Sequence, residues 1–385
     1  MLVLIVLVSV FTPIVYTQKL YVIVNNPSSC VIGDRCHSYT KGIGVTIDDI
    51  LRNKIQQKIT FNNQSLFVKL SAIFTMFMFV EGVINSVLSL LTFQNIELRK
   101  IGCGIYLLAS SITSLLTISI FTVKFWFVIY TQINISVNMS FYRVGCIIIE
   151  PLLKILVYLD AWLNGCVAIE RTLNVYKGVQ FDKKKSRRAA RWIVKILPIF
   201  IMVTMIHEPL HRHLFEYTNE IYQSKEIDNQ TNETMIYKTE KHVLCVMTYS
   251  NFLQNYNTII LFFHLIVPFL ANLCSALYII FGTARRRSTA QTKQTFRELI
   301  FKQFNEHKQL VISPLILLCL SLPRLIISLI SACITVSDNP SLYLCAYFIS
   351  FIPSMLIFIV FIFPSDLYMK TFKDSLRKYR RHSHH

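Results

Sequence analysis

Residues 146–172 read CIIIEPLLKILVYLDAWLNGCVAIERT, and this stretch decides the fold. It begins with a cysteine, continues with mostly apolar residues and ends near the acid–base pair Glu170-Arg171. At 1.5 Å per residue, an α-helix from Cys146 to Arg171 would be roughly 38 Å long. The hydrocarbon core of a bilayer is about 30 Å thick. The stretch therefore predicts a helix that crosses a membrane and reaches both interfaces.

The whole chain has the composition of a membrane protein. Of its 385 residues 53% are hydrophobic and only 16% are charged, whereas soluble domains carry about 25% charged residues. This balance argues against a disordered chain, a collagen-like repeat and a disulfide-dense miniprotein, and it disfavours a soluble enzyme.

Seven apolar stretches are long enough to cross a bilayer, although the fourth is short. In lipid the backbone must satisfy its own hydrogen bonds, so each stretch is expected to be α-helical. The stretches are 66–93, 101–125, 146–173, 192–208, 252–283, 308–334 and 341–364. We predict an all-α integral membrane protein with a seven-transmembrane helix bundle.

The apolar run at 2–16 is too short for a comfortable span, and we interpret residues 1–18 as a cleaved signal peptide. An additional membrane helix is the alternative. The remainder divides into a short extracellular region at 19–65, a seven-transmembrane domain at 66–367 and a cytoplasmic tail at 368–385.

The net charge of +18 is distributed unevenly over the loops. A strongly basic chain often binds nucleic acid. With the N-terminus outside, however, the inner segments hold 22 Lys and Arg against five acidic residues, and the outer segments hold 11 against ten. The inner segments are 94–100, 174–191, 284–308 and 368–385. This asymmetry follows the positive-inside rule, so the charge indicates orientation and no nucleic-acid partner is expected.

Two further patterns agree with an outer N-terminus. All five N-x-S/T glycosylation sequons lie in segments assigned to the outside: Asn63, Asn134, Asn138, Asn229 and Asn232.

Cysteine positions give the other pattern. Cys146 begins the third stretch at its outer end and Cys245 lies late in the long outer loop, so we predict a disulfide between them. Cys30 and Cys36 are predicted to close a small extracellular loop. Cys333 and Cys345 flank the last outer loop and are a further candidate pair.

The third stretch resembles the third helix of the rhodopsin-like (class A) G-protein-coupled receptors. That helix runs from an outer cysteine to an inner Asp/Glu-Arg-Tyr motif, which here reads Glu170-Arg171-Thr172. The resemblance covers about 66–380, but the switch motifs are degenerate. The family's Cys-Trp-x-Pro is replaced by a segment ending in Pro323. Its Asn-Pro-x-x-Tyr keeps Pro364, loses the Asn and has the tyrosine displaced by one, to Tyr368.

The resemblance implies a multi-pass receptor of the plasma membrane that passes the binding of an extracellular ligand to a heterotrimeric G protein. Arg171 would contact the G protein when the helices part, with Glu170 as its partner at rest. Pro323 and Pro364 would mark the moving sixth and seventh helices. We expect no enzymatic activity and no cofactor.

By the same resemblance, a ligand site opens outward between the third, fifth, sixth and seventh stretches. Two cations at this depth, Lys154 and Arg324, favour a ligand with a peptide carboxylate or another anionic group. The alternative is a Lys154–Glu150 pair at i,i+4 that serves the helix only. The candidate lining residues are Glu150, Lys154, Tyr158, His264 and Arg324.

Asp160 lies in the middle of the third stretch, where a carboxylate is costly unless it faces the interior. We expect it to form a polar core with Asn85 and Ser114. The cluster would either hold a sodium ion or be a buried acid that hydroxyl groups satisfy.

The inner segments carry KKKSRR at 183–188 and RRR at 285–287, which are suited to a G protein or to anionic lipid headgroups. In the tail, aromatic and apolar residues recur every three to four positions between basic ones. This spacing predicts an amphipathic helix lying on the membrane.

Two other classes of protein stay open. The first is a transporter or channel of seven helices, which should show broken helices around a midplane site. The second is a metalloprotease, because residues 207–211 read HEPLH and match the zinc motif H-E-x-x-H. Pro209 would disturb the helix that this motif needs, so we interpret the match as accidental and expect no metal.

Overall fold

The computed structural model places the chain in two compact units, Met1–Thr40 and Lys41–His385. In the first unit the described residues are two short antiparallel strands, β1 (Val31–Ile32) and β2 (Tyr39–Thr40). The second unit contains the helices. The structure describes residues 31–32, 39–40, 46–51, 54–56, 59–134, 138–222, 237–247, 249–279, 315–316, 319–320, 322 and 340–382.

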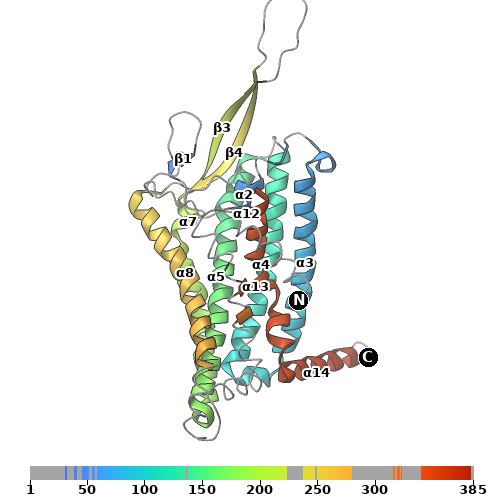
Figure 1. The fold of residues 1–385 in the computed structure, drawn as a ribbon, viewed down its shortest axis with the longest axis vertical. Coiled ribbons are helices and arrows are strands. Elements are labelled where there is room, and N and C mark those ends of the chain that lie inside the picture. Colours follow the sequence, from blue (N-terminus) through green and yellow to red (C-terminus); the bar gives the residue numbers. More distant parts are fainter. Residues whose placement is uncertain are drawn as a thin grey trace, which may run out of the picture. The chain divides into compact units, whose positions relative to one another are not determined.

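Long α-helices dominate the second unit, and α3, α4 and α5 run side by side (Figure 1). α5 (Met139–Lys177) is the longest described helix and also packs against α8. Four spans are long and apolar enough to cross a membrane by length and composition. They are α3 (Leu66–Phe93), α4 (Gly102–Ile133), α6 (Lys183–Met205) continued by α7 (His207–Leu210), and α8 (Asn251–Leu277). These helices indicate insertion into a membrane.

The bounds of α3 agree with the predicted stretch, whereas α4 and α5 extend further than predicted. Most of the segment 126–145, predicted as a loop, is therefore helical. α6 begins nine residues before the predicted start at 192, because Asp182 caps it by accepting hydrogen bonds from the backbone N–H groups of Lys184 and Lys185. These hydrogen bonds, that from Lys185 first, hold the pKa of Asp182 below its usual value. KKKSRR thus forms the first turns of a helix instead of a loop.

The seventh predicted stretch is not one continuous helix. It consists of α12 (Pro340–Ile349), α13 (Ile352–Met355) and a π-helical turn, η5 (Phe358–Ile362). Pro353 lies in the first turn of α13 and has no N–H to bond back to the preceding turn, which explains why the helix restarts there.

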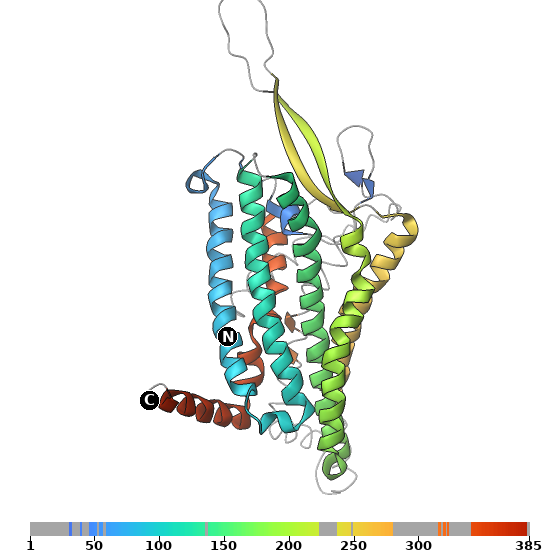
Figure 2. The same ribbon diagram turned by 180° about the vertical axis from the view of Figure 1, so that it is seen from behind.

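The tail forms α14 (Asp366–His382), the helix that the sequence predicts, beginning two residues earlier. α14 packs against α3 and lies crosswise to it (Figures 1 and 2). Its contact with a membrane surface stays a prediction.

The prediction of an all-α protein misses a β-hairpin in the segment 209–250. β3 (Arg212–Tyr222) and β4 (Tyr237–Met247) pair antiparallel, from Arg212 opposite Met247 to Tyr222 opposite Tyr237 (Figure 2). Both strands are rich in aromatic and β-branched residues, which favour extended structure.

Only short helical pieces of the sixth predicted stretch, at 315–316, 319–320 and 322, belong to the described residues. The seven-helix bundle and its orientation therefore stay predictions. Several other predicted features lie outside the described residues. They are residues 1–18, Cys30, Cys36, Cys333, Asn229, Asn232, Pro323, Arg324 and 285–287.

Candidate functional site

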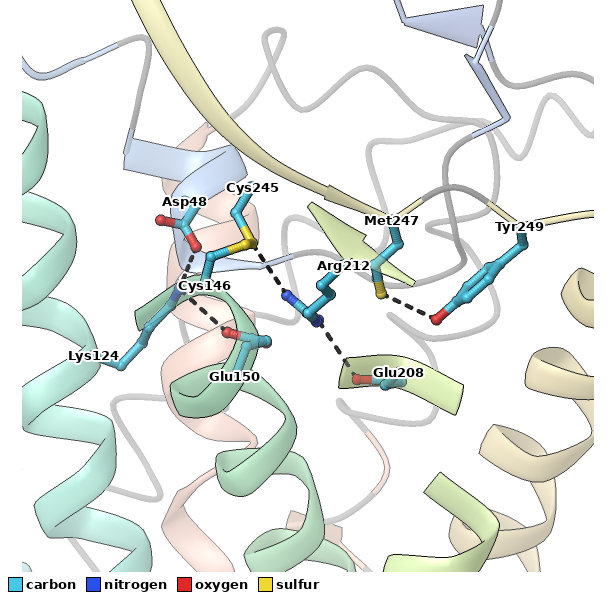
Figure 3. Close-up of a disulfide and its surroundings, with 9 residues drawn as sticks. All are labelled: Asp48, Lys124, Cys146, Glu150, Glu208, Arg212, Cys245, Met247 and Tyr249. Atoms are coloured by element: carbon cyan, nitrogen blue, oxygen red, sulfur yellow. Dashed lines mark hydrogen bonds and ion pairs between the residues drawn. A yellow bond between two sulfur atoms is a disulfide. The ribbon is translucent and has the colours of Figure 1, made fainter. Parts of the chain in front are cut away.

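A disulfide fastens the β-hairpin to the first turns of α5. It joins Cys146 of α5 to Cys245 of β4, as the sequence predicts, with the two Cα atoms 5.7 Å apart (Figure 3). Since β3 and β4 are paired, this single bond places both strands at the Cys146 end of α5. The charged residues described next lie around it.

The first charged group is centred on Lys124 of α4. Its ammonium donates a hydrogen bond to Asp48 Oδ2 and lies 3.6 Å from Glu150 Oε2 of α5. Asp48 comes from α2 (Ile47–Leu51), a short helix that precedes the bundle in the sequence. The side chains of Lys124 and Glu150 are 1% and 4% exposed, so the group is buried.

The second charged group is centred on Glu208 of α7. Lys154 of α5 donates to Glu208 Oε1 over 2.5 Å, and Arg212 of β3 lies 3.5 Å from Glu208 Oε2. Arg212 also donates to the sulfur of Cys245 over 3.7 Å, which connects the group to the disulfide (Figure 3). The hairpin, α5 and α7 thus meet in one buried ionic contact.

Together the two groups contain three carboxylates and three cations, so they are formally neutral. Buried charges require such pairing, because an isolated charge loses its hydration without compensation. The predicted alternative of a Lys154–Glu150 pair is wrong: each residue pairs with a different partner. Lys154 is therefore occupied, whereas Arg324, the other cation of the anionic-ligand hypothesis, lies outside the described residues, so that hypothesis stays a prediction.

The sequence analysis missed Lys124, Asp48 and Arg212. Lys124 carries a signal in the sequence, since it is a charge near the end of an apolar stretch, where ionisable residues usually have a specific partner.

In the sequence Glu208 stands out only as part of the HEPLH motif. In the structure His207 Nε2 is 2.9 Å from Asn257 Oδ1, and His211 Nδ1 is 3.0 Å from the His207 carbonyl. The letters of the motif thus belong to three separate contacts, and the described residues contain no group of His, Cys, Asp and Glu arranged to hold a metal.

Tyr158 and His264 lie together, with ring centroids 5.2 Å apart and nearly parallel, while their role in lining a ligand site stays a prediction. Both are buried. Trp162 donates to His264 Nδ1 over 2.9 Å, and His264 Nε2 is 2.9 Å from the Thr204 hydroxyl. Both nitrogens of His264 are therefore engaged, and this histidine joins α5, α6 and α8.

Asp160 forms a polar core, but neither of the predicted partners, Asn85 and Ser114, bonds to it directly. Its carboxylate accepts hydrogen bonds from Ser110 over 2.5 Å and from Ser354 of α13 over 2.8 Å. Ser114 joins by donating to the Ser354 carbonyl. Asn85 does not join, because its amide donates to Glu81 over 2.8 Å within α3. The carboxylate is thus bonded to two hydroxyl groups, and whether the cluster also holds a sodium ion stays a prediction.

At the other end of α5, Glu170 and Arg171 do not pair with each other. Glu170 accepts from the Ser186 hydroxyl of α6. The Arg171 guanidinium lies over the ring of Phe361, 5.1 Å from its centroid, and interacts with Cys103 and Tyr368. Within the described part of the chain no carboxylate lies within ion-pair distance of Arg171. The expectation that Glu170 is its resting partner is therefore wrong.

Tyr368, in the first turn of α14, also contacts Phe93 of α3 edge to face, with centroids 5.4 Å apart. Pro364 lies in the turn between η5 and α14. Tyr368 thus lies with Arg171 where a carboxylate partner was expected. It is the tyrosine that stands one position away from its place in the Asn-Pro-x-x-Tyr motif.

The three described sequon asparagines, Asn63, Asn134 and Asn138, are exposed at helix ends. Asn138 caps α5 by accepting from the Ser140 N–H over 2.9 Å. Their glycosylation stays a prediction.

Comparison with protein-family models and with curated proteins finds no match for this chain. The resemblance to receptors therefore depends on the residues of this chain and on their arrangement.

Proposed function

We propose that this chain is a divergent G-protein-coupled receptor of the plasma membrane, with the hairpin outside and α14 inside. The observation that carries the proposal is α5 itself. One end is tied to the hairpin by the Cys146–Cys245 disulfide, and the other end holds a buried Arg171 against η5 and α14. A receptor of this kind needs one helix that touches both its ligand-facing and its G-protein-facing ends.

The contacts of Arg171 suit a switch. A guanidinium cannot lose its proton, so inside a helix bundle it needs polar or aromatic partners. Here the partners are neutral: a thiol, a phenol and an aromatic ring. Neutral partners hold a guanidinium less firmly than a carboxylate would. A G protein that offers acceptors could therefore draw Arg171 away when α14 and η5 shift.

The test uses the full-length protein in lipid nanodiscs with one heterotrimer from each Gα class, and it measures GTPγS uptake. We expect at least one heterotrimer to exchange nucleotide faster than with empty nanodiscs. Tyr368→Phe removes a hydroxyl that interacts with Arg171. A hydrogen bond to a charged group is worth about 1.5–3 kcal/mol, so the basal rate should rise by roughly ten- to a hundredfold. Arg171→Gln should lower the rate to that of empty nanodiscs.

Tyr130→Phe is the matched control, because it removes the same hydroxyl from an exposed site toward the far end of α4. It should leave the rate unchanged. If neither the wild type nor Tyr368→Phe accelerates exchange on any heterotrimer, the receptor proposal is refuted.

A transporter or channel is the second candidate, and the break between α12 and α13 favours it. Discontinuous helices free backbone groups, and here the Ser354 carbonyl accepts from Ser114 near the buried Asp160. This candidate predicts ion or solute flux into proteoliposomes that Asp160→Asn abolishes, without any acceleration of nucleotide exchange.

A further inference from the structure

The short helix α2 is embedded in the bundle although it precedes the first long helix. Ile47, Ile50 and Leu51 are 0%, 1% and 0% exposed. They belong to one apolar cluster with Phe121 and Phe125 of α4 and with side chains of α3, α5 and α12. Their burial makes α2 part of the packed interior of the second unit.

The same segment supplies the hydrogen-bonding partner of Lys124. The bundle's own carboxylate, Glu150, is 3.6 Å away, and its Oε2 has no hydrogen bond. Asp48 instead accepts directly from the ammonium (Figure 3). The cation is completely buried and makes its strong contact to a residue outside the long helices. Lys124 with Glu150 is thus a carboxylate-binding site that α2 fills.

We propose that residues 46–51 act as an intramolecular ligand, with Asp48 as the anchoring carboxylate and Lys124 as its receptor residue. The inference rests on the proposed receptor function and names the chemistry of its ligand site. An external ligand with a carboxylate competes with Asp48, while Glu150 stays behind as the counter-ion. Because α2 contacts both α4 and α12, the bound segment restrains the resting state.

The restraint has a path to the other end of the molecule. α12 leads through α13, whose Ser354 bonds to Asp160, to Phe361, which covers Arg171. Displacement of α2 removes contacts from the beginning of this path. Release of the segment should therefore raise basal G-protein activation.

The first experiment measures hydrogen–deuterium exchange of the full-length protein in nanodiscs. Asp48→Asn weakens the anchor, while Lys124 keeps Glu150 as a counter-ion, so the bundle should still fold. Exchange at the amides of Ile50 and Ile55, which bond to the carbonyls of Thr46 and Leu51, should rise by about tenfold or more, because the lost contact is a charged, buried one.

Asp374→Asn is the control, since it removes the same charge from a side chain that is 56% exposed in α14, and it should leave the exchange near its original rate. Asp48→Glu, which keeps the carboxylate, should restore most of the protection. Unchanged protection in Asp48→Asn would overturn the anchoring and with it the proposal.

The second experiment offers the segment in trans. The fluorescent peptide TIDDIL, which copies residues 46–51, should bind the Asp48→Asn protein at millimolar concentration, the effective concentration of a short tether. The peptide TINDIL should not bind. Equal binding of the two peptides, or of neither, would show that no carboxylate site is being filled.

The third measurement is basal GTPγS uptake. Asp48→Asn should raise it several-fold, and TIDDIL should lower it again. If the peptide binds and the wild type activates a G protein, but Asp48→Asn does not change the rate, the regulatory role is refuted. If the peptide binds and no variant activates any G protein, the site stands and the receptor proposal fails.

Discussion

Replacing Glu208 by Gln should destabilise the protein strongly, because this carboxylate holds two buried cations. It bonds to Lys154 over 2.5 Å and lies 3.5 Å from Arg212, and the side chains of Glu208 and Arg212 are 1% and 3% exposed. Removing one partner of a buried pair costs about 3–5 kcal/mol, since the remaining charge keeps its desolvation penalty. Here two cations would be left facing each other, so we expect the upper part of this range.

The protein itself contains a control, an exposed ion pair with nearly the same N···O distance. Lys100 and Glu97 form a pair over 2.6 Å, but their side chains are 56% and 71% exposed. Water compensates for the loss of such a pair, so Glu97→Gln should change the free energy of unfolding by less than about 1 kcal/mol. The two pairs hardly differ in distance, so the difference between the variants measures the effect of burial together with that of the second cation, Arg212.

The assay is unfolding of the purified protein by SDS in mixed micelles, followed by the fluorescence of its three tryptophans, one of which, Trp162, packs against His264. The double variant Lys154→Met/Glu208→Gln removes one of the stranded cations. It should therefore be less destabilised than the sum of the single variants, by about 1–3 kcal/mol. The reasoning is wrong if Glu208→Gln behaves like Glu97→Gln, or if the double variant equals that sum.

Two further predictions concern packing and the polar core. Ser354→Ala removes a hydrogen bond to the buried Asp160 and should lower the free energy of unfolding by about 1.5–3 kcal/mol in the same assay; a value within 0.5 kcal/mol of zero, as surface substitutions usually give, would contradict the Asp160 core. Gly104→Ala would bring a Cβ against the Leu98 carbonyl, whereas at Gly165 the nearest atom is 3.6 Å away. The first substitution should lower the midpoint of thermal inactivation and the second should not, and equal midpoints would count against the packing between α4 and the turn before it.

Sequence reasoning located the features that depend on local composition. The bounds of α3 and the helical tail follow from apolar length and periodicity, and the Cys146–Cys245 pair follows from where the two cysteines fall between the spans. The break in the seventh stretch also had a local cause in Pro353, but overall apolarity concealed it.

The contacts between distant segments were not accessible in the same way. Asp48 and Lys124 are 76 residues apart, and nothing near Asp48 indicates a buried partner. Glu170 was assigned to its neighbour Arg171, yet its partner Ser186 comes from the helix that Asp182 starts earlier than expected. Once the start of α6 is displaced, the residues that reach Glu170 change as well. Because the predicted start of α6 lies too late in the chain, the sequence also gives the wrong partner for Glu170.

The division of the last apolar segment into α12, α13 and η5 has a mechanical consequence. A continuous helix would behave as a stiff rod, and a tilt imposed at one end would appear unchanged at the other. Three short pieces instead have ends at Ser350 and Leu356, and the ends of elements are where changes of backbone angle can be absorbed. The middle piece, α13, packs against the continuous helices α3 and α4, and its Ser354 donates a hydrogen bond to Asp160 of α5. A tilt at either end of the segment would therefore have to pass the hydrogen bond between Ser354 and Asp160, so this one carboxylate should limit how far α12 and η5 move relative to each other.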